Sequence, residues 1–250
     1  MNQTQLYLST IDENAGAAAR EYGLGIEITH FCTALNLDFY RERTEAAVQA
    51  QVSGIPRRLL HGPFNELFPC AIDPKARELA AFRYDQALQL TKSYGAGKLI
   101  LHGGYHPKLY YPCWYVEQSV HFWREFLEKH PNSYEICLEN VLEEEPEMLL
   151  SIVSQVNDPR LRLCLDVGHV NAYSSIPVED WIGHWGSLLS HAHLHNNHKD
   201  ADTHSALWDG TLDIKALMNA LPKAATATLE LPEIGENLRW LTEQGLLAHP

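Results

Sequence analysis

Short apolar runs, each long enough for one β-strand, recur along the chain and alternate with longer stretches in which apolar residues follow the period of an α-helix. The strand-like runs are residues 5–9, 25–29, 58–61, 98–102, 134–139, 161–166, 190–195 and 226–231. Strands that alternate with helices predict βαβ units and therefore a parallel sheet.

The stretches between these runs carry helical signals. Leu79, Phe82 and Ala87 recur at helical spacing, and Asp73-Pro74 supplies a cap residue followed by proline at the first helical position. The predicted helices are residues 11–22, 42–52, 74–94, 116–129, 144–156, 178–189, 214–221 and 234–247.

Eight strand–helix units in 250 residues match the number and size of a (β/α)8 TIM barrel. An open, doubly wound sheet has the same local pattern and is the alternative fold. The unit count favours the barrel, so we expect a single TIM-barrel domain over residues 1–250.

Polar, metal-binding residue types stand where the later strands end. In a barrel these ends all open onto one face, the C-terminal face, where active sites are built. Buried ionisable groups are costly unless they are paired or bind a metal, and no run of Lys or Arg accompanies them here. A divalent ion is therefore the simplest partner. The residues are His61, His102, Glu139, Asp166, His169, His193, His195 and Glu230.

The loop after the seventh run adds Asp202 and His204, whose spacing lets both face one ion from an extended loop. A solvated polar loop is the alternative for Asp202 taken alone. The segment from His191 to His204 is rich in histidine and can also bind metal adventitiously.

Composition narrows the classes of function. The chain has 19 Lys and Arg against 32 Asp and Glu, a net charge of −13, which argues against binding nucleic acid by bulk charge. No apolar run approaches the roughly 20 residues that span a bilayer, and the N-terminus lacks the pattern of a signal peptide. Five scattered cysteines fit a reducing, cytoplasmic compartment.

The residues at the strand ends resemble those of the xylose isomerase-like TIM barrels, a superfamily that includes sugar isomerases and epimerases and the endonuclease IV type of AP endonuclease (family 2). The resemblance covers most of the chain, above all the third to eighth strands. In the endonuclease pattern it implies three ions. Glu139, Asp166, His193 and Glu230 would hold the first, His61, His102 and Glu139 the second, and His169, Asp202 and His204 the third.

The epimerase branch resembles a subset of this pattern, with Glu139, Asp166, His193 and Glu230 around one ion and His169 near the substrate. The chain departs from the endonuclease pattern at Asn196, where the pattern has an aspartate. The resemblance thus implies a cofactor of one to three divalent ions, and the mixed His and carboxylate donors suit Zn or Mn.

Two enzyme mechanisms fit this set. In the first, a sugar or sugar phosphate is isomerised or epimerised through an enediolate, with Glu139 and Glu230 as base and acid. In the alternative, two or three ions support hydrolysis of a phosphate ester. A metal-binding barrel without catalysis is a third class. The negative charge and short, weakly basic loops disfavour a DNA substrate, so we expect a small carbohydrate, no nucleic acid and no membrane; a homo-oligomer is left open.

Several side chains in the loops of the C-terminal face are suited to packing on the apolar faces of a sugar, although ordinary loop packing explains the aromatic ones equally well. The predicted substrate contacts are Phe64, Tyr105, Trp114, His195 and Trp208.

Overall fold

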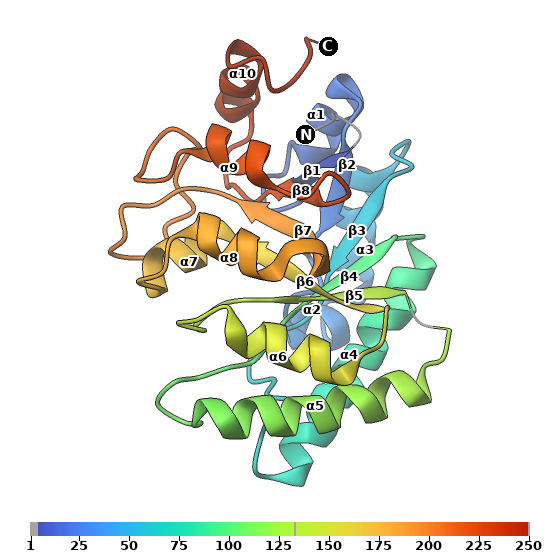
Figure 1. The fold of residues 1–250 in the computed structure, drawn as a ribbon. Helices are drawn as coiled ribbons and strands as arrows, with labels where there is room; N and C mark the ends of the chain where they lie inside the picture. The colour runs from blue at the N-terminus through green and yellow to red at the C-terminus, as the bar shows by residue number, and fades with distance from the viewer. Residues whose placement is uncertain (1–4, 133, 250) are drawn as a thin grey trace.

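The computed structural model describes residues 5–132 and 134–249. Its strands form a closed parallel barrel in chain order, and β8 pairs with β1 to complete the ring (Figure 1). The strands are β1 (Leu6–Ser9), β2 (Gly25–Ile28), β3 (Arg58–His61), β4 (Lys98–His102), β5 (Glu135–Glu139), β6 (Leu161–Asp166), β7 (Leu189–Leu194) and β8 (Thr226–Leu229). The predicted (β/α)8 TIM barrel is confirmed, and the open sheet is excluded.

Helices follow the strands and surround the barrel (Figure 1). The helices are α1 (Ala15–Tyr22), α2 (Ala34–Asp38), α3 (Arg41–Val52), α4 (Pro74–Ser93), α5 (Pro112–Lys129), α6 (Glu147–Val156), α7 (Val167–Tyr173), α8 (Val178–Trp185), the 3₁₀ turn η2 (Gly186–Leu188), α9 (Ile214–Ala220) and α10 (Gly235–Glu243). The sequence pattern did not predict α2 and α7. It did predict the start of α4, where the Asp73 side chain accepts a hydrogen bond from the backbone N–H of Lys75 at 2.8 Å and Pro74 is the first helical residue.

The barrel interior explains why the predicted ligands share one space. Alternate residues of a strand point to the same face. Leu59, Ile100, Cys137 and Cys164 form, with Tyr7, a small buried cluster inside the barrel. His61, His102, Glu139 and Asp166 each follow one of the four residues of β3 to β6 in this cluster by two positions. They therefore point to the same inward face, nearer the C-terminal mouth.

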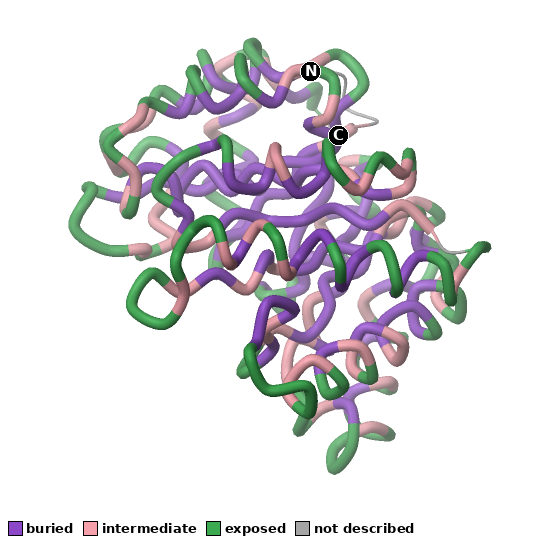
Figure 2. The backbone as a smooth tube through the Cα atoms, turned by 60° about the horizontal axis from the view of Figure 1, so that its bottom comes forward, coloured by how far each residue is buried: buried purple, intermediate pink, exposed green. Residues whose placement is uncertain are grey.

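A second and much larger apolar core fills the space between the barrel and its helices. Trp123 of α5 stacks on Tyr84 of α4 with ring centroids 5.6 Å apart, and both rings are fully buried. In Figure 2 the buried segments run through the centre of the molecule, and the exposed ones follow the outer helices and loops. Within residues 5–132 and 134–249, no helix combines the length and apolar character needed to span a membrane.

Candidate metal centre

Four buried side chains converge at the C-terminal mouth of the barrel. Glu139, Asp166 and His193 lie at the ends of β5, β6 and β7, and Glu230 directly follows β8. One donor atom from each lies within 4.8 Å of a donor atom from every other. Glu139, Asp166 and His193 are at most 1% exposed, and Glu230 is 9% exposed. The structure thus brings together the four residues predicted to hold the first ion.

The nitrogen Nδ1 of His193 faces this group without a hydrogen-bond partner, although it is buried. It lies 3.0 Å from Glu230 Oε2, 3.3 Å from Glu139 Oε1 and 3.7 Å from Asp166 Oδ2. A buried nitrogen without a partner is costly. One nitrogen and three carboxylates gathered so closely fit a divalent ion, and this donor set suits Zn or Mn.

Glu139 presents its other carboxylate oxygen to a second pair of residues. His61 Nε2 lies 3.0 Å from Glu139 Oε2, and His102 Nε2 lies 3.6 Å from the same oxygen. Both histidines predicted for the second ion therefore lie beside the carboxylate that belongs to the first set. This arrangement suits a bridging glutamate. The ring of Phe64 stacks on His102 with centroids 4.2 Å apart, which places this predicted substrate contact at the site.

The third predicted set meets at Asp202. The Nε2 atoms of His169 and His204 each lie 3.2 Å from Asp202 Oδ2. His195 adds a further ring that stacks on His204, with Nε2 3.0 Å from Asp166 Oδ1 and Nδ1 3.7 Å from Asp202 Oδ1. That nitrogen and that oxygen are both buried without a hydrogen-bond partner. Asp202 thus faces three imidazoles in one small space.

The helix α7 explains the Asp-x-x-His spacing of Asp166 and His169. Asp166 caps this helix, and its carboxylate accepts a hydrogen bond from the backbone N–H of His169 at 2.7 Å. The cap places His169 in the first helical turn, beside the strand end. The amide of Asn140 links β5 to β6, because its Oδ1 accepts from the Asp166 N–H at 2.9 Å and its Nδ2 donates to the Asp166 carbonyl.

Backbone carbonyl groups fix the orientation of three of the imidazoles. Nδ1 of His61, His169 and His204 lies 3.0, 2.9 and 2.9 Å from the carbonyl oxygens of Gly62, Asn140 and Glu230, respectively. A carbonyl oxygen only accepts, so each Nδ1 carries a proton and each Nε2 faces the site. Such partners set the tautomer of histidines that bind metals.

The charges of the metal-free site are strongly coupled. Burial raises the pKa of Asp166, but the neighbouring His169 and His195 outweigh burial and hold that pKa at about 2. Burial lowers the pKa of His169, but Asp166, Asp202 and Glu139 raise it to about 10. The pKa of His204 is raised to about 9 against the effect of burial, chiefly by Asp202. The carboxylates therefore favour the protonated form of these imidazoles.

Metal binding should release one or more protons per ion, because a ligating imidazole must be neutral. With the pKa values of His169 and His204 raised to about 10 and about 9, protons compete with the ion throughout the neutral range. We therefore expect affinity to rise as the pH increases toward these values. Zinc titration calorimetry in buffers of different ionisation enthalpy measures the released protons. An affinity that does not change between about pH 6 and pH 9 would contradict this assignment.

Three of the aromatic residues predicted to contact substrate pack on or bond to protein groups outside the ligand sets. Tyr105 packs on Tyr115 with centroids 4.9 Å apart. Trp114 donates from Nε1 to the Cys70 carbonyl at 2.9 Å. Trp208 lies against Trp240 of α10 and is 45% exposed. Their roles as substrate contacts stay predictions.

Glu27 of β2 belongs to the site and was not predicted. It is fully buried, its Oε1 lies 3.1 Å from His193 Nε2, and its Oε2 lies 3.1 Å from His191 Nε2. Burial raises its pKa, but His193 and His191 outweigh burial and keep that pKa well below its usual range. The signal in the sequence was an acidic residue between Ile26 and Ile28, inside an otherwise apolar strand.

Asn196, which stands where the endonuclease pattern has an aspartate, organises the loop after β7. Its Nδ2 donates to the carbonyls of Leu207 and Leu212, both at 3.0 Å. Its Oδ1 accepts from the backbone N–H of Asn197 at 3.0 Å. A Cβ atom at Gly210 would lie 2.1 Å from this oxygen, so the loop needs glycine there. The Asn196 side chain therefore holds the backbone of this loop in place.

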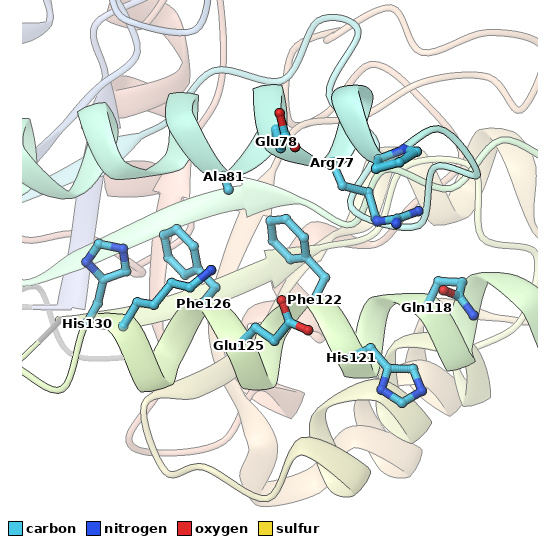
Figure 3. Close-up of a pocket in the computed structure, with 11 residues that line it drawn as sticks. Arg77, Glu78, Ala81, Gln118, His121, Phe122, Glu125, Phe126 and His130 are labelled. Atoms are coloured by element: carbon cyan, nitrogen blue, oxygen red, sulfur yellow. The ribbon is translucent and has the colours of Figure 1, made fainter.

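A surface hollow of about 550 Å³ lies elsewhere, between α4 and α5 (Figure 3). Arg77 and Glu78 of α4 and Phe122, Glu125 and Phe126 of α5 are among its lining residues. It shares no lining residue with the site at the barrel mouth, so it is a separate surface feature.

A TIM barrel with a His and carboxylate centre at its C-terminal mouth defines a class of metal-site barrel. The model of the xylose isomerase-like TIM barrel family matches residues 10–244, and the chain belongs to this family. Over 209 residues it is 24% identical to the uncharacterized protein MJ1311 of Methanocaldococcus jannaschii, an alignment that covers 78% of this chain and 68% of that protein.

Two solved structures illustrate the similarity. The TTHB071 protein of Thermus thermophilus, in a structure soaked with ZnCl2, has a TM-score of 0.77 at 25% identity, over 97% of this chain and 98% of that chain. D-Psicose 3-epimerase of Clostridium cellulolyticum H10, solved with D-tagatose, has a TM-score of 0.66 at 18% identity, over 93% of this chain and 86% of that chain. At this level of identity, the similarity to the epimerase shows a shared fold.

Proposed function

We propose that this chain is a divalent-metal-dependent isomerase or epimerase of a sugar or sugar phosphate. The observation that carries the proposal is the convergence of Glu139, Asp166, His193 and Glu230 at the mouth of a barrel of this family. The fold shared with a D-psicose 3-epimerase supports a carbohydrate substrate, and the zinc-soaked relative supports a divalent ion. Zn and Mn both suit the donors, and we expect the enzyme to act in the reducing cytoplasm, in keeping with its five free cysteines.

The chemistry requires removal of a proton beside a carbonyl and its return to the neighbouring carbon or to the opposite face. When bound, a divalent ion would polarise the carbonyl and the adjacent hydroxyl and stabilise the enediolate oxygens. Glu139 and Glu230 hold and move the proton as base and acid. Glu139 ends β5 and Glu230 follows β8, and one carboxylate oxygen of each lies within 4.8 Å of one of the other, so a substrate bound over this centre would be within reach of both. We assign His169 to substrate contact.

The substrate would enter over the residues that flank the centre. Phe64, stacked on His102, offers an apolar ring beside the ligands. His195 lies next to Asp166 and Asp202 and can orient hydroxyl groups. The barrel mouth thus joins one apolar wall to a polar one, as sugar binding needs.

Phosphoester hydrolysis is the second candidate, favoured by one observation: the histidines predicted for the second and third ions lie beside one carboxylate each, Glu139 and Asp202. Ions bound there would give the multi-ion centre that ester displacement uses. The net charge of −13 disfavours a DNA duplex as the ester. The number of ions bound per chain therefore separates the two candidates.

The test is incubation of the zinc- or manganese-loaded protein with a panel of ketoses, aldoses and their phosphates in deuterium oxide. Incorporation of deuterium at the carbon beside the carbonyl, detected by NMR, is the expected result. An oligonucleotide with an abasic site and a simple phosphate ester are assayed in parallel. Ester cleavage without deuterium incorporation would replace the first proposal by the second.

A further inference from the structure

We propose that Glu27 is the positioning residue of the metal ligand His193, held in place by a hydrogen-bonded column inside the barrel. The inference rests on the metal part of the proposed function. Glu27 Oε1 lies 3.1 Å from Nε2 of His193, and the other ring nitrogen, Nδ1, faces Glu139 and Glu230. Glu27 therefore touches the ligand from behind and has no described contact with the other three ligands.

The chemistry of this pair decides which nitrogen can bind an ion. A carboxylate only accepts hydrogen bonds, so Nε2 of His193 donates to Glu27 and carries the proton. In the neutral ring, Nδ1 is then left with its lone pair directed at the metal centre. A carboxylate behind a ligating histidine fixes its tautomer and ring orientation and makes it a more basic ligand.

His193 differs in this respect from three other imidazoles of the site. The Nδ1 atoms of His61, His169 and His204 are satisfied by neutral backbone carbonyls. Only for His193, among these four rings, is the partner behind the ring a charged side chain. Hydrogen bonds to a carboxylate are stronger than those to a carbonyl. The structure thus places a charged orienting partner behind the one histidine of the first set.

Glu27 is itself fixed from neighbouring strands. Its Oε2 accepts from His191 Nε2 at 3.1 Å and from the hydroxyl of Thr228. His191 Nδ1 in turn lies 2.7 Å from the hydroxyl of Thr226. Strands β2, β7 and β8 therefore meet at one carboxylate, which accepts hydrogen bonds from three side chains.

The column continues to the opposite end of the barrel. Lys98 Nζ donates to Thr226 Oγ1 at 3.1 Å and to Ser190 Oγ at 2.8 Å. The hydroxyl of Ser190 donates to Glu135 Oε1 at 2.6 Å, and the Glu135 side chain is 32% exposed. A chain of hydrogen bonds thus runs from the partly exposed end of β5 to the metal ligand.

The position of Glu27 argues for a role beyond packing. The interior of a TIM barrel is usually filled by layers of branched apolar side chains. A fully buried carboxylate has a desolvation cost that an apolar side chain would avoid. Orienting a metal ligand accounts for that cost.

The test compares zinc affinities by calorimetry on metal-free proteins at one pH. Glu27→Gln keeps the size of the side chain but removes the charge, and it should weaken zinc binding by about 10- to 100-fold. Glu233→Gln makes the same change in the loop after β8, outside the column, and should leave the affinity unchanged. Thr228→Val removes the hydroxyl that donates to Glu27 and also lies 3.0 Å from His191 Nε2, and it should give a smaller loss in the same direction. If circular dichroism shows that Glu27→Gln does not fold, Thr228→Val provides the test in its place.

A double-mutant cycle separates positioning from general damage. If Glu27 acts through His193, then Glu27→Gln should cause no further loss of zinc affinity in a His193→Ala background. Equal affinity of wild type and Glu27→Gln would overturn the proposal, as would an additive loss in the cycle. A wild-type chain that binds no zinc would overturn both this inference and the metal part of the proposed function. Tight zinc binding without sugar turnover would refute the sugar reaction alone.

Discussion

Glu230→Gln should abolish proton exchange into the sugar substrate, with a loss of about 10²- to 10⁴-fold or more, while the barrel stays folded. Gln cannot take up or return the proton, and its neutral amide is a weaker metal ligand than a carboxylate. Glu233→Gln is the matched control, because Glu233 lies in the same loop and its carboxylate accepts hydrogen bonds from the backbone N–H groups of Gly235 and Glu236. Deuterium incorporation measured by NMR, with the bound metal quantified, provides the comparison.

His61→Ala tests the division of labour in the same assay. His61 contacts Glu139 Oε2, whereas His193 faces Oε1 of the same carboxylate, and His61 is not among the four residues proposed to hold the first ion. Its loss should therefore leave measurable turnover in the isomerase or epimerase mechanism. In phosphoester hydrolysis His61 would hold an ion that takes part in the displacement. His61→Ala should then lower activity as much as Glu230→Gln does, because the effects of residues that act as a unit are not additive. Equal loss of sugar exchange in both variants, with the first ion still bound, would refute our assignment.

The strand-end ligands could be predicted because the fold itself places them. Parallel strands of a closed barrel present their carboxyl ends to one mouth, so residues such as His102, Glu139 and Asp166 must meet once the strands are assigned. The register confirms how closely they do so: His102 is the direct partner of Glu139 across β4 and β5, and Asp166 is that of His193 across β6 and β7. Periodicity located the strand ends, and the resemblance to the family grouped their residues into ligand sets.

Side-chain directions in loops and inside the barrel could not be predicted in this way. Trp114 and Trp208 follow strands in the sequence, and the pattern did not predict that their side chains contact the Cys70 carbonyl and Trp240. Glu27 lies within a strand, and its role depends on pairing with residues more than a hundred and sixty positions away. The helix α7 was missed because β6 runs into it without a loop, so that Asp166 ends the strand and caps the helix at once.

Chelation of the bound metal should lower the melting temperature of the wild-type protein by about 10 °C at neutral pH. An ion present at a thousand times its Kd stabilises the native state by about 4 kcal/mol. In a chain of this size each kcal/mol shifts the melting temperature by about 2–4 °C. The ligand set is buried, so we expect the ion to bind the native state far more tightly than the unfolded chain.

The pH of this measurement matters, because the metal-free site is stabilised by its own pairs of imidazole and carboxylate. The pKa of His169 is raised to about 10, so its contribution to stability is fully present below the unfolded value of ~6.5 and is lost as the pH rises through about 10. The lowered pKa of Asp202 contributes stability above the unfolded carboxyl value, and this is lost as the pH falls. Near pH 7 both pairs still stabilise the protein without metal, so the shift on chelation measures the loss of the ion net of the stability that these pairs restore.

His193→Ala provides the control, since it removes the only nitrogen ligand of the first set. The melting temperature of this variant should respond far less to the chelator than that of the wild type. Differential scanning calorimetry of both proteins, with and without chelator, makes the comparison, and readdition of zinc or manganese should restore the wild-type transition. A wild-type melting temperature that chelator leaves unchanged, in a protein shown to contain metal beforehand, would mean that the ion does not bind at this buried centre. Ion pairs between protonated histidine and the carboxylates would then explain why four buried side chains converge there. These side chains are Glu139, Asp166, His193 and Glu230.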